Sequence, residues 1–284
     1  LLPQILQVLA PQPGERAVDC TLGHGGHASA ILETGVTLLG LDQDPLEIVR
    51  TEAKLREKAA PDALIVKRMN FAGIRRALDE CGWHDGADLI LADLGCSSMQ
   101  FDNPSRGFSF KHDGPLDMRM NPQRGLSARD LLQKLSAAKL QTILTDNADE
   151  PRAELLAQAL AGTDQATTRA FAAAIRAALP YRIDEEEREA TVRRVFQALR
   201  IAVNEEFTAL DTFLQQLPDC LRPGGRVAIL TFHSGEDRRV KHLFRDALRG
   251  GIFSETNDEV IRPSAEEIRA NPRAAPAKLR WARK

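Results

Sequence analysis

Residues 17–28 read AVDCTLGHGGHA, and after a helical stretch residues 38–42 read LLGLD. The pattern predicts a strand, a glycine turn, a helix and a second strand that ends in a carboxylate. Glycines let the backbone of such a turn approach a ligand closely, and the following helix presents unpaired N–H groups to it. A carboxylate about 20 residues after the first glycine suits a ribose diol. The segment therefore predicts a site for a cofactor that contains adenosine.

Two classes of cofactor fit this turn. Gly23-x-Gly25-x-x-Ala28 also satisfies the loose fingerprint for NAD or FAD. Asp19 lies four residues before the first glycine and favours S-adenosylmethionine, because a carboxylate there can pair with the ammonium of a methionine moiety. That cofactor also has a ribose for Asp42 and no pyrophosphate. A plain strand-to-helix turn with an N-cap aspartate is the alternative without a ligand.

Length and composition agree with an enzyme of more than one domain. The 284 residues exceed a typical single domain, and the 43% apolar content suffices for a core. No apolar run approaches the roughly 20 residues that cross a bilayer, and there is no signal peptide, so we expect a soluble, cytoplasmic protein. Four cysteines without a C-x-x-C pair argue against disulfides and structural zinc.

Charge is distributed unevenly around a net value of −2. Residues 262–284 contain seven basic and two acidic residues, and residues 237–249 contain five basic and two acidic ones. Either stretch could contact phosphates, although a charge run of this size is more often a solvated face.

Strand and helix patterns alternate as in βαβ units, which predicts a doubly wound, mostly parallel sheet. We expect strands at 17–20, 37–42, 63–67, 87–92 and 225–231, two closing strands at 259–262 and 278–283, and helices at 28–32, 45–58 and 71–81. Pro223–Gly225 is interpreted as a tight turn into the fifth strand. Such a sheet binds ligands at the carboxyl ends of its strands, where Asp19, Asp42, Asp93 and His233 fall.

About 130 residues separate the fourth and fifth predicted strands, too many for one crossover connection. Helical spacing at 127–135, 149–161 and 166–179 predicts a small helical domain over about 127–183, followed by one long helix at 186–217. Ser127 and Asp164 are candidate N-caps, and Pro180 is a candidate helix stop.

The loop after the fourth strand begins Asp93-Leu94-Gly95-Cys96. Familiar amino-methyltransferases have an Asn or Asp, two prolines and an aromatic residue there, so the residues alone predict an S-adenosylmethionine-dependent methyltransferase of unknown substrate. Acceptors that hold an amine's N–H groups would orient its lone pair toward the methyl group.

Seven blocks in order along the chain resemble the bacterial 16S ribosomal RNA cytosine-N4 methyltransferase family (RsmH/MraW type). They are DCTLGHGGH at 19–27, DLGCSS at 93–98, RGFSF at 106–110, DGPLDMRM at 113–120, FQALRIAVN at 196–204, FHSGEDR at 232–238, and NPR at 271–273 with KLR at 278–280. Gly235 stands where that family commonly has leucine.

The resemblance implies an α/β class I (Rossmann-like) methyltransferase with an inserted all-helical domain. It implies methyl transfer from S-adenosylmethionine to the exocyclic N4 of a cytosine in the decoding centre of 16S ribosomal RNA. Because a net charge near zero disfavours tight binding to bare RNA, we expect the assembled small subunit as substrate. Residues 1–110 and 195–284 would form the methyltransferase core, and residues 111–194 the inserted loop and substrate-recognition domain.

Motif by motif, the resemblance also implies the cofactor contacts, with Asp19 as a further candidate. These are the Gly25, Gly26 and His27 backbone, Asp42 on the ribose, Phe71 beside adenine, and Asp93 and Gln100 near the methionine end. Asp44, just before Pro45, competes with Asp42 but is better interpreted as a helix N-cap.

The catalytic residue is unknown, with Asp93, Asp117 and His233 as candidates. An extruded cytosine could stack on Phe108 or Phe110 and meet Arg119, although both rings could equally pack the loop onto the helical insert. His24 and His27 lack a third ligand of convincing spacing, so we expect no metal. A nicotinamide oxidoreductase, a methyltransferase with another acceptor and a non-catalytic ribosome-assembly factor are the alternatives.

Overall fold

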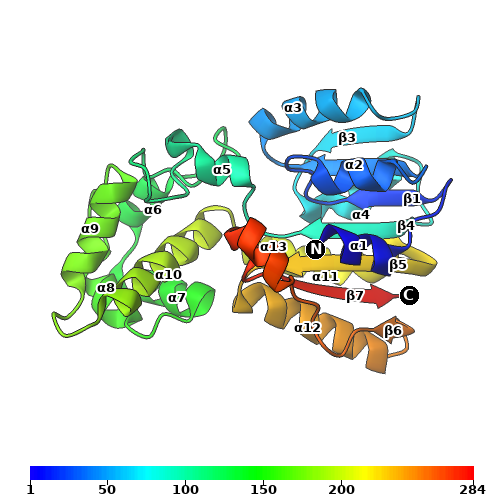
Figure 1. Cartoon of the computed structure of the whole chain (residues 1–284). Coiled ribbons are helices and arrows are strands. Elements are labelled where there is room, and N and C mark those ends of the chain that lie inside the picture. The colour runs from blue at the N-terminus through cyan, green and yellow to red at the C-terminus, as the bar shows by residue number, and fades with distance from the viewer. The chain divides into compact units, whose positions relative to one another are not determined.

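The computed structural model describes residues 1–284, which form two compact units (Figure 1). Unit 1 comprises Leu1–Gly95 and Phe207–Lys284, and unit 2 comprises Cys96–Glu206. Residues 96–206, which lie between the fourth and fifth strands, therefore have a core of their own. The predicted division into a methyltransferase core and a recognition domain stays a prediction. None of the helices combines the length and the apolar character needed to cross a membrane.

Unit 1 is built on a seven-stranded sheet of order β3-β2-β1-β4-β5-β7-β6. The first five strands in chain order pair in parallel, and β7 runs antiparallel to both β5 and β6. Their bounds are β1 Arg16–Asp19, β2 Thr37–Asp42, β3 Leu64–Arg68, β4 Ala87–Asp93, β5 Leu221–Thr231, β6 Glu255–Thr256 and β7 Lys278–Arg283.

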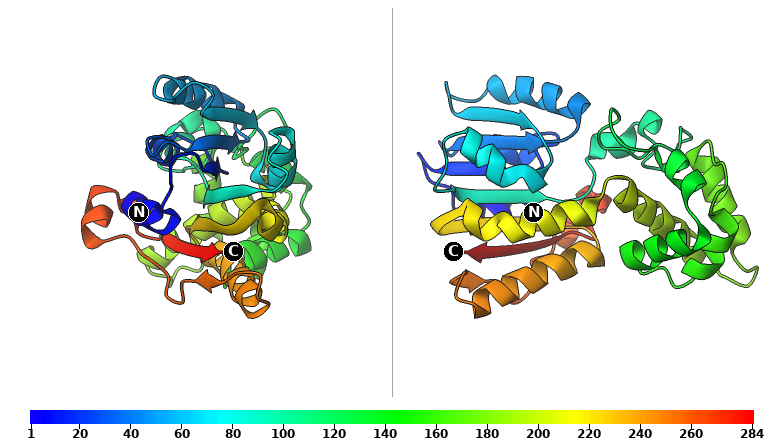
Figure 2. Two further views of the ribbon diagram at one scale, coloured as in Figure 1. Left: turned by 90° about the vertical axis from the view of Figure 1, so that its right-hand side faces the viewer. Right: turned by 180° about the vertical axis from the view of Figure 1, so that it is seen from behind.

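Helices cover both faces of this sheet (Figure 2). Alternate strand residues face opposite ways, so Val18 and Ile90 join one apolar layer while Ala17 and Leu89 join the other. The first layer packs on α4 Ile74–Glu80, α11 Glu206–Cys220 and α12 Ser234–Arg249, and the second on α1 Leu2–Leu9, α2 Gly26–Leu32 and α3 Pro45–Arg56. The short helices η1 Phe71–Gly73, α13 Ala265–Ala270 and η3 Pro272–Ala274 complete the unit.

Unit 2 is helical and has its own apolar core around Phe171, Ile175 and Leu144. Apolar residues at helical spacing bury one face of each longer helix, as the sequence pattern predicts. The helices are α5 Ser98–Asp102, η2 Pro104–Arg106, α6 Ala128–Lys134, α7 Ala137–Ala148, α8 Ala153–Leu160, α9 Thr168–Ala178 and α10 Glu185–Val203.

The predicted parallel strands are confirmed to within a few residues at their ends, but two details of the sheet differ. Residues 259–262 form no strand, since only Ile261 makes a bridge, to Leu279. Strand β6 lies earlier, and the side chain of Asn257 ends it by accepting the Trp281 N–H at 2.8 Å in place of a backbone oxygen. Residues 223–225 form an irregular bulge within β5 rather than a turn before it, because the pairing passes from Leu221 directly to Arg226.

The prediction of one helix over 186–217 is wrong. The helix ends at Val203, Glu205 adopts a left-handed φ of 50°, and α11 starts at Glu206. The side chain of Asn204 turns back to the loop at 118–120, so the break has a structural purpose.

One of the smaller helix predictions is confirmed and the others differ from the structure. Ser127 is the N-cap of α6, as predicted. Asp164 is not a cap, because it pairs with Arg129 and Thr167 caps α9 instead. Residues 137–148 form α7, a helix that the sequence analysis missed, and residues 149–152 lie outside α8.

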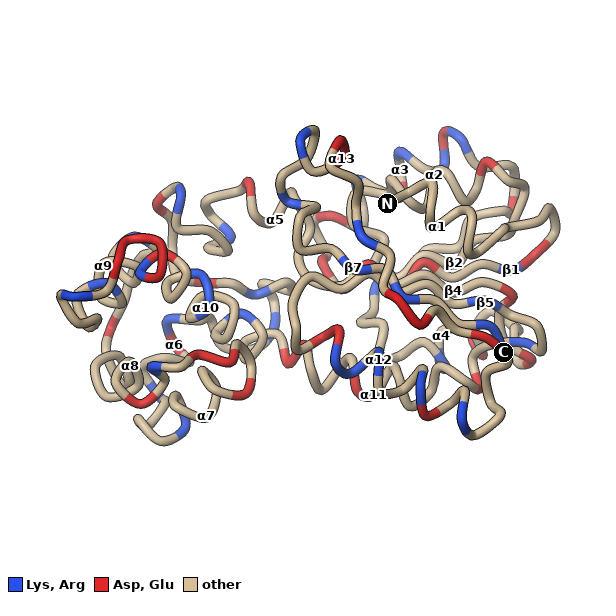
Figure 3. Tube along the Cα trace, turned by 60° about the horizontal axis from the view of Figure 1, so that its bottom comes forward, with Lys and Arg blue, Asp and Glu red and all other residues tan.

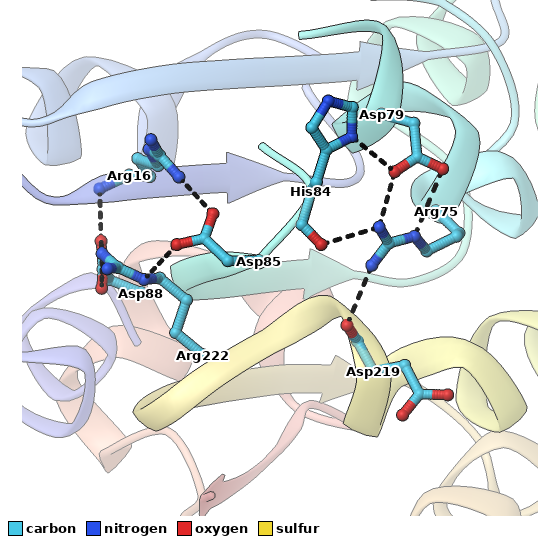
Figure 4. A network of polar contacts seen from close by, with 8 residues as sticks. All are labelled: Arg16, Arg75, Asp79, His84, Asp85, Asp88, Asp219 and Arg222. Carbon is cyan, nitrogen blue, oxygen red and sulfur yellow. Dashed lines mark hydrogen bonds and ion pairs between the residues drawn. The ribbon is translucent and has the colours of Figure 1, made fainter. Parts of the chain in front are cut away.

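The edge of the sheet where β1 and β4 begin is closed by a polar network (Figure 4). Asp88 accepts the Arg16 backbone N–H at 2.9 Å and pairs with Arg222 at 3.1 Å. Asp85 joins the same two arginines. A second group links Arg75, Asp79, His84 and the carbonyl of Asp219. Because these charges satisfy one another, this edge is structural, and the candidate site lies at the carboxyl ends of the strands.

Candidate active site

Three carboxylates end three neighbouring strands of unit 1. Asp19 ends β1, Asp42 ends β2 and Asp93 ends β4, and the sheet order places these strands side by side. The parallel register aligns Asp19 with Gly40 and Leu91, two residues before the other two strand ends. The sequence-based expectation that these three residues converge at one edge is therefore met by the fold (Figure 1).

The turn after β1 is hydrogen-bonded to the carboxylates of Asp19 and Asp42 and to the backbone of Asp93. The Thr21 N–H donates to Asp19 Oδ1 at 3.0 Å, and the Gly23 N–H donates to Asp42 Oδ2 at 2.8 Å. The Asp93 N–H donates to the hydroxyl oxygen of Thr21 at 2.7 Å. Thr21 thus fixes β1 to β4, a role that the sequence analysis did not assign although the residue belongs to its first motif.

Two glycines shape the entry into α2. Gly25 is the N-cap, with φ of 74°, and a Cβ there would lie 2.8 Å from Thr51 Cγ2. A side chain is therefore excluded by both conformation and space. A Cβ on Gly26 would meet nothing within 4 Å, so the first turn of the helix has open space beside it. His27 lies in the first turn of this helix, which begins at Gly26.

The buried carboxyls resist ionisation. Burial, with repulsion from Asp42, raises the pKa of Asp19 to about 7. Burial, with repulsion from Asp19 and Glu236, raises the pKa of Asp93 to about 7, and burial raises the pKa of Asp42 as well. Asp93 Oδ1 is enclosed and has no hydrogen-bond partner. A cluster of this kind attracts a cationic group and repels a phosphate.

Asp42 and Asp44 have different roles in the structure. Asp44 is fully buried and caps α3 by accepting the Leu46 N–H at 2.9 Å, as the sequence predicts. Asp42 remains half-buried and accepts the Asp44 N–H through Oδ1 at 2.8 Å. A carboxylate has about four acceptor positions, so Asp42 keeps acceptors for a diol.

Phe71 begins η1 directly beyond β3 and is half-buried. Its ring meets Phe213 edge-on, with centroids 5.5 Å apart. The preceding Asn70 donates to the side chain of Gln43 at 3.0 Å and so links the ends of β3 and β2. The sequence analysis missed Asn70 because an Asn before a short helix is ordinarily only a cap.

Two histidines lie near the strand ends. His27 Nδ1 is 3.5 Å from Asp93 Oδ2, and burial lowers the pKa of His27, so its ring is neutral at pH 7. His233 Nε2 lies 3.2 Å from Glu236 Oε1, but neither ring nitrogen makes a well-directed hydrogen bond. The Phe207 ring packs on His233 at 5.7 Å, and a Cβ on Gly235 would lie 2.5 Å from that ring. Gly235 therefore makes room for Phe207.

The block that follows His233 is structural. Glu236 accepts the Phe232 N–H at 2.7 Å. Asp237 is buried and binds Lys278 at 3.0 Å and Arg280 at 2.7 Å, which holds the pKa of Asp237 below its usual range. Two motifs 40 residues apart thus form one ion-pair cluster, and neither cation of 278–280 is available for phosphate.

The remaining candidates lie in unit 2. Gln100 is 5% exposed, and its side-chain oxygen accepts the Ser97 N–H at 3.1 Å in a capping box of α5. The same side chain thus fixes the start of the short helix that follows the Asp93 loop. The implied cofactor role of Gln100 remains a prediction.

Asp117 and Arg119 form a two-pronged ion pair. Arg119 Nε donates to Asp117 Oδ1 at 2.8 Å, and a terminal nitrogen donates to Oδ2 at 2.7 Å. The loop around them is anchored by Asn204, which accepts the Met120 N–H at 2.7 Å and donates to the Met118 carbonyl at 2.8 Å. Arg106 also donates to the carbonyls of Arg119 and Met120, at 2.9 Å each. The sequence blocks at 106–110, 113–120 and 196–204 are therefore joined by one hydrogen-bond network.

Phe108 and Phe110 pack within unit 2. Phe108 is 5% exposed and meets Phe101 edge-on, and Phe110 meets Phe196 at 5.0 Å. This packing matches the alternative in which both rings secure the loop against the helices.

The sheet order, the antiparallel β7, the glycine turn and the acidic strand ends together define a class I methyltransferase. The whole chain, residues 1–284, matches the model of the MraW methylase family, and the protein belongs to that family. The predicted resemblance is thereby confirmed, and S-adenosylmethionine is the methyl donor that this membership supports.

Named relatives cover almost all of the chain. Ribosomal RNA small subunit methyltransferase H 1 of Lachnoclostridium phytofermentans is 47% identical over 98% of this chain and 79% of its own length. Ribosomal RNA small subunit methyltransferase H of Nitratidesulfovibrio vulgaris strain DP4 is 40% identical over 100% of this chain and 94% of its own. Among solved structures, an rRNA methylase from Streptococcus thermophilus aligns over 100% of this chain and 93% of its own, with a TM-score of 0.46 and 9% identity.

Proposed function

We propose that this protein transfers a methyl group from S-adenosylmethionine to the exocyclic N4 of a cytosine in the decoding centre of 16S ribosomal RNA. The more general part of this proposal is methylation of small-subunit ribosomal RNA. It rests on relatives of 40–47% identity that are named ribosomal RNA small subunit methyltransferase H. The base and its position rest on the seven sequence blocks, and an assembled subunit as substrate rests on the formal net charge of −2. A ribosomal substrate in turn supports a cytoplasmic location.

The acidic edge of the sheet is the observation that carries the cofactor assignment. A dinucleotide would bring a pyrophosphate to the glycine turn, where Asp19, Asp42 and Asp93 would repel it. S-adenosylmethionine instead brings an ammonium and a sulfonium. The enclosed, unpartnered Oδ1 of Asp93 fits such a cation.

Each residue has a defined part in this proposal. The backbone at 25–27 would contact the cofactor, Asp42 would accept its ribose hydroxyls, and Phe71 would lie beside adenine. Asp93 and Gln100 would lie near the methionine end, and Asp19 would add negative potential from behind the turn, since it is only 1% exposed. The bound cofactor supplies an electrophilic methyl group. The chain's own contribution is to hold the cofactor and the target base in the orientation needed for transfer. Such positioning alone can lower a reaction barrier substantially.

Asp93, Asp117 and His233 are the candidates for accepting a proton from the target amine. Both oxygens of Asp117 already accept hydrogen bonds from Arg119, so Asp117 is better suited to fix that guanidinium in place than to act as a base. Asp93 and His233 have unpartnered polar atoms, and of the proposed candidates they are the better suited to accept a proton.

A pair of measurements tests this assignment against a nicotinamide enzyme and a non-catalytic factor. Calorimetry should show binding of S-adenosylmethionine and none of NADH. Radiolabelled S-adenosylmethionine should then label the RNA of small subunits that lack the modification, and Asp93→Ala should abolish labelling with an unchanged thermal melt. Binding of NADH alone would reverse the cofactor assignment, whereas cofactor binding without transfer to any subunit would leave a binding-only role.

A further inference from the structure

The basic stretch at 237–249 separates into two sets of charges in the structure. Asp237 is buried against Lys278 and Arg280. Arg239 turns inward, with Nε 3.1 Å from Asp211 and its guanidinium 3.7 Å above the Phe207 ring. These charges serve the fold and are not available to a partner.

The other cations of α12 lie on one exposed face. Arg238, Lys241, Arg245 and Arg249 are all exposed, at spacings of three, four and four residues. At about 100° per residue, such positions fall on a single stripe. The buried side chains Val240, Phe244 and Ala247 lie on the opposite face against the sheet. We call the four exposed cations the α12 stripe. Figure 3 shows the Lys and Arg positions of the whole chain in blue along the Cα trace.

Helix stability does not account for the α12 stripe. Cations stabilise the last turn of a helix through its dipole, which explains Arg249 but not Lys241 in the first half. Like charges at such spacings repel by a few tenths of a kcal/mol. Arg245 pairs with the exposed Asp246 at 2.9 Å, and no carboxylate lies within ion-pair distance of Lys241 or Arg249.

The geometry of the stripe suits a polyanion. From residue 238 to residue 249 a helix rises about 16 Å, which matches several consecutive phosphates of a nucleic-acid strand. The chain as a whole carries a formal charge of −2, so affinity for an anionic particle must come from a local surface. The stripe concentrates four cations on one such surface.

We propose that the α12 stripe docks the phosphodiester backbone of the ribosomal RNA substrate, an inference that rests on the proposed function and adds a binding surface to it. The stripe contributes affinity and salt dependence, and the chemistry takes place at the strand ends. Phosphate contacts of this kind position a protein on RNA without reading its sequence.

A charge-matched pair of variants tests this surface. The stripe variant is Lys241→Gln/Arg245→Gln/Arg249→Gln. The control variant is Arg50→Gln/Lys58→Gln/Arg76→Gln, which removes the same charge from exposed positions on and near α3 and α4. Both are compared with the unaltered protein by thermal melting, by calorimetry with S-adenosylmethionine, and by co-sedimentation with unmodified small ribosomal subunits from 50 to 300 mM KCl.

We expect the stripe variant to bind subunits about tenfold more weakly near 0.1 M salt, with a log–log salt slope smaller by about 2, while the control changes little. Melting and cofactor affinity should not change. Equal losses in both variants, or none in either, would overturn the proposal. Loss of binding to phosphatidylglycerol vesicles with unchanged subunit binding would also overturn it and indicate a membrane surface.

Co-sedimentation needs no turnover, so the two proposals can fail separately. If the unaltered protein binds subunits through the stripe yet transfers no methyl group, the docking surface stands and the proposed function fails. If it transfers methyl groups and the stripe variant binds as the control does, the proposed function stands and the docking surface fails.

Discussion

Single carboxylates at the strand ends carry the proposed cofactor site. Asp19 and Asp93 each have a pKa of about 7, because both are buried and repel one another and their acidic neighbours. A cation favours their ionised forms. Cofactor affinity should therefore be coupled to proton release near neutrality.

This coupling predicts that S-adenosylmethionine binds at least tenfold more tightly at pH 8 than at pH 6. Both carboxyls are largely protonated and neutral at pH 6 and ionised at pH 8. His27, whose pKa is lowered by burial, does not oppose this trend, because any protonation of its ring at lower pH would also repel a cation. Calorimetry at both pH values, in buffers of different ionisation enthalpy, measures the affinity and the protons released. Asp93→Asn should flatten the dependence, and an affinity that falls with pH would contradict the account.

Two residues in the same turn should separate binding from stability. Asp44→Ala removes the α3 cap, which accepts from Leu46 and Glu47, and should lower the free energy of unfolding by about 1–2 kcal/mol. Asp42→Asn should weaken cofactor binding at least tenfold with a smaller loss of stability. Urea denaturation and calorimetry on both variants measure the two effects. The reverse pattern would show that Asp44, not Asp42, holds the ribose.

At the level of elements, the break between α10 and α11 organises the loop of unit 2. Asn204 bonds to Met120 and Met118 and also to the Arg200 carbonyl at 2.9 Å. Asn204→Ala should leave buried backbone groups unpaired and cost about 1–3 kcal/mol. Hydrogen exchange should rise at 117–121 more than elsewhere. Thr142→Ala, which loses only an exposed bond to Ala138, is the control, and equal exchange in both variants would show that Asn204 does not anchor the loop.

The elements also show what the sequence could and could not predict. The parallel strands and the acidic edge were predictable, because buried strands carry continuous apolar runs and end in polar residues. The break at Asn204 and Glu205 was not, since both neighbouring segments have helical spacing and the break depends on a partner loop 84 residues earlier. The inward orientation of Arg239 could not be predicted from the sequence either, because its partners Asp211 and Phe207 lie on another helix.

For the whole molecule, whose formal net charge is −2, we expect bare RNA to be a poor substrate. With 38 basic and 40 acidic residues, non-specific attraction to phosphate is weak, and recognition must use local surfaces such as the α12 stripe. We expect kcat/KM for assembled small subunits to exceed that for protein-free 16S RNA by at least tenfold. Steady-state labelling of both substrates at equal salt measures the ratio, and a preference for free RNA would contradict it.

The most direct test of the central claim is nucleoside analysis of the RNA after reaction. Small subunits from cells that lack the modification would be incubated with the protein and labelled S-adenosylmethionine, then digested and separated by chromatography with mass detection. The account predicts label in N4-methylcytidine, and none with Asp93→Ala. Label in any other nucleoside, or none while calorimetry confirms that the cofactor binds, would contradict methylation at the cytosine amine.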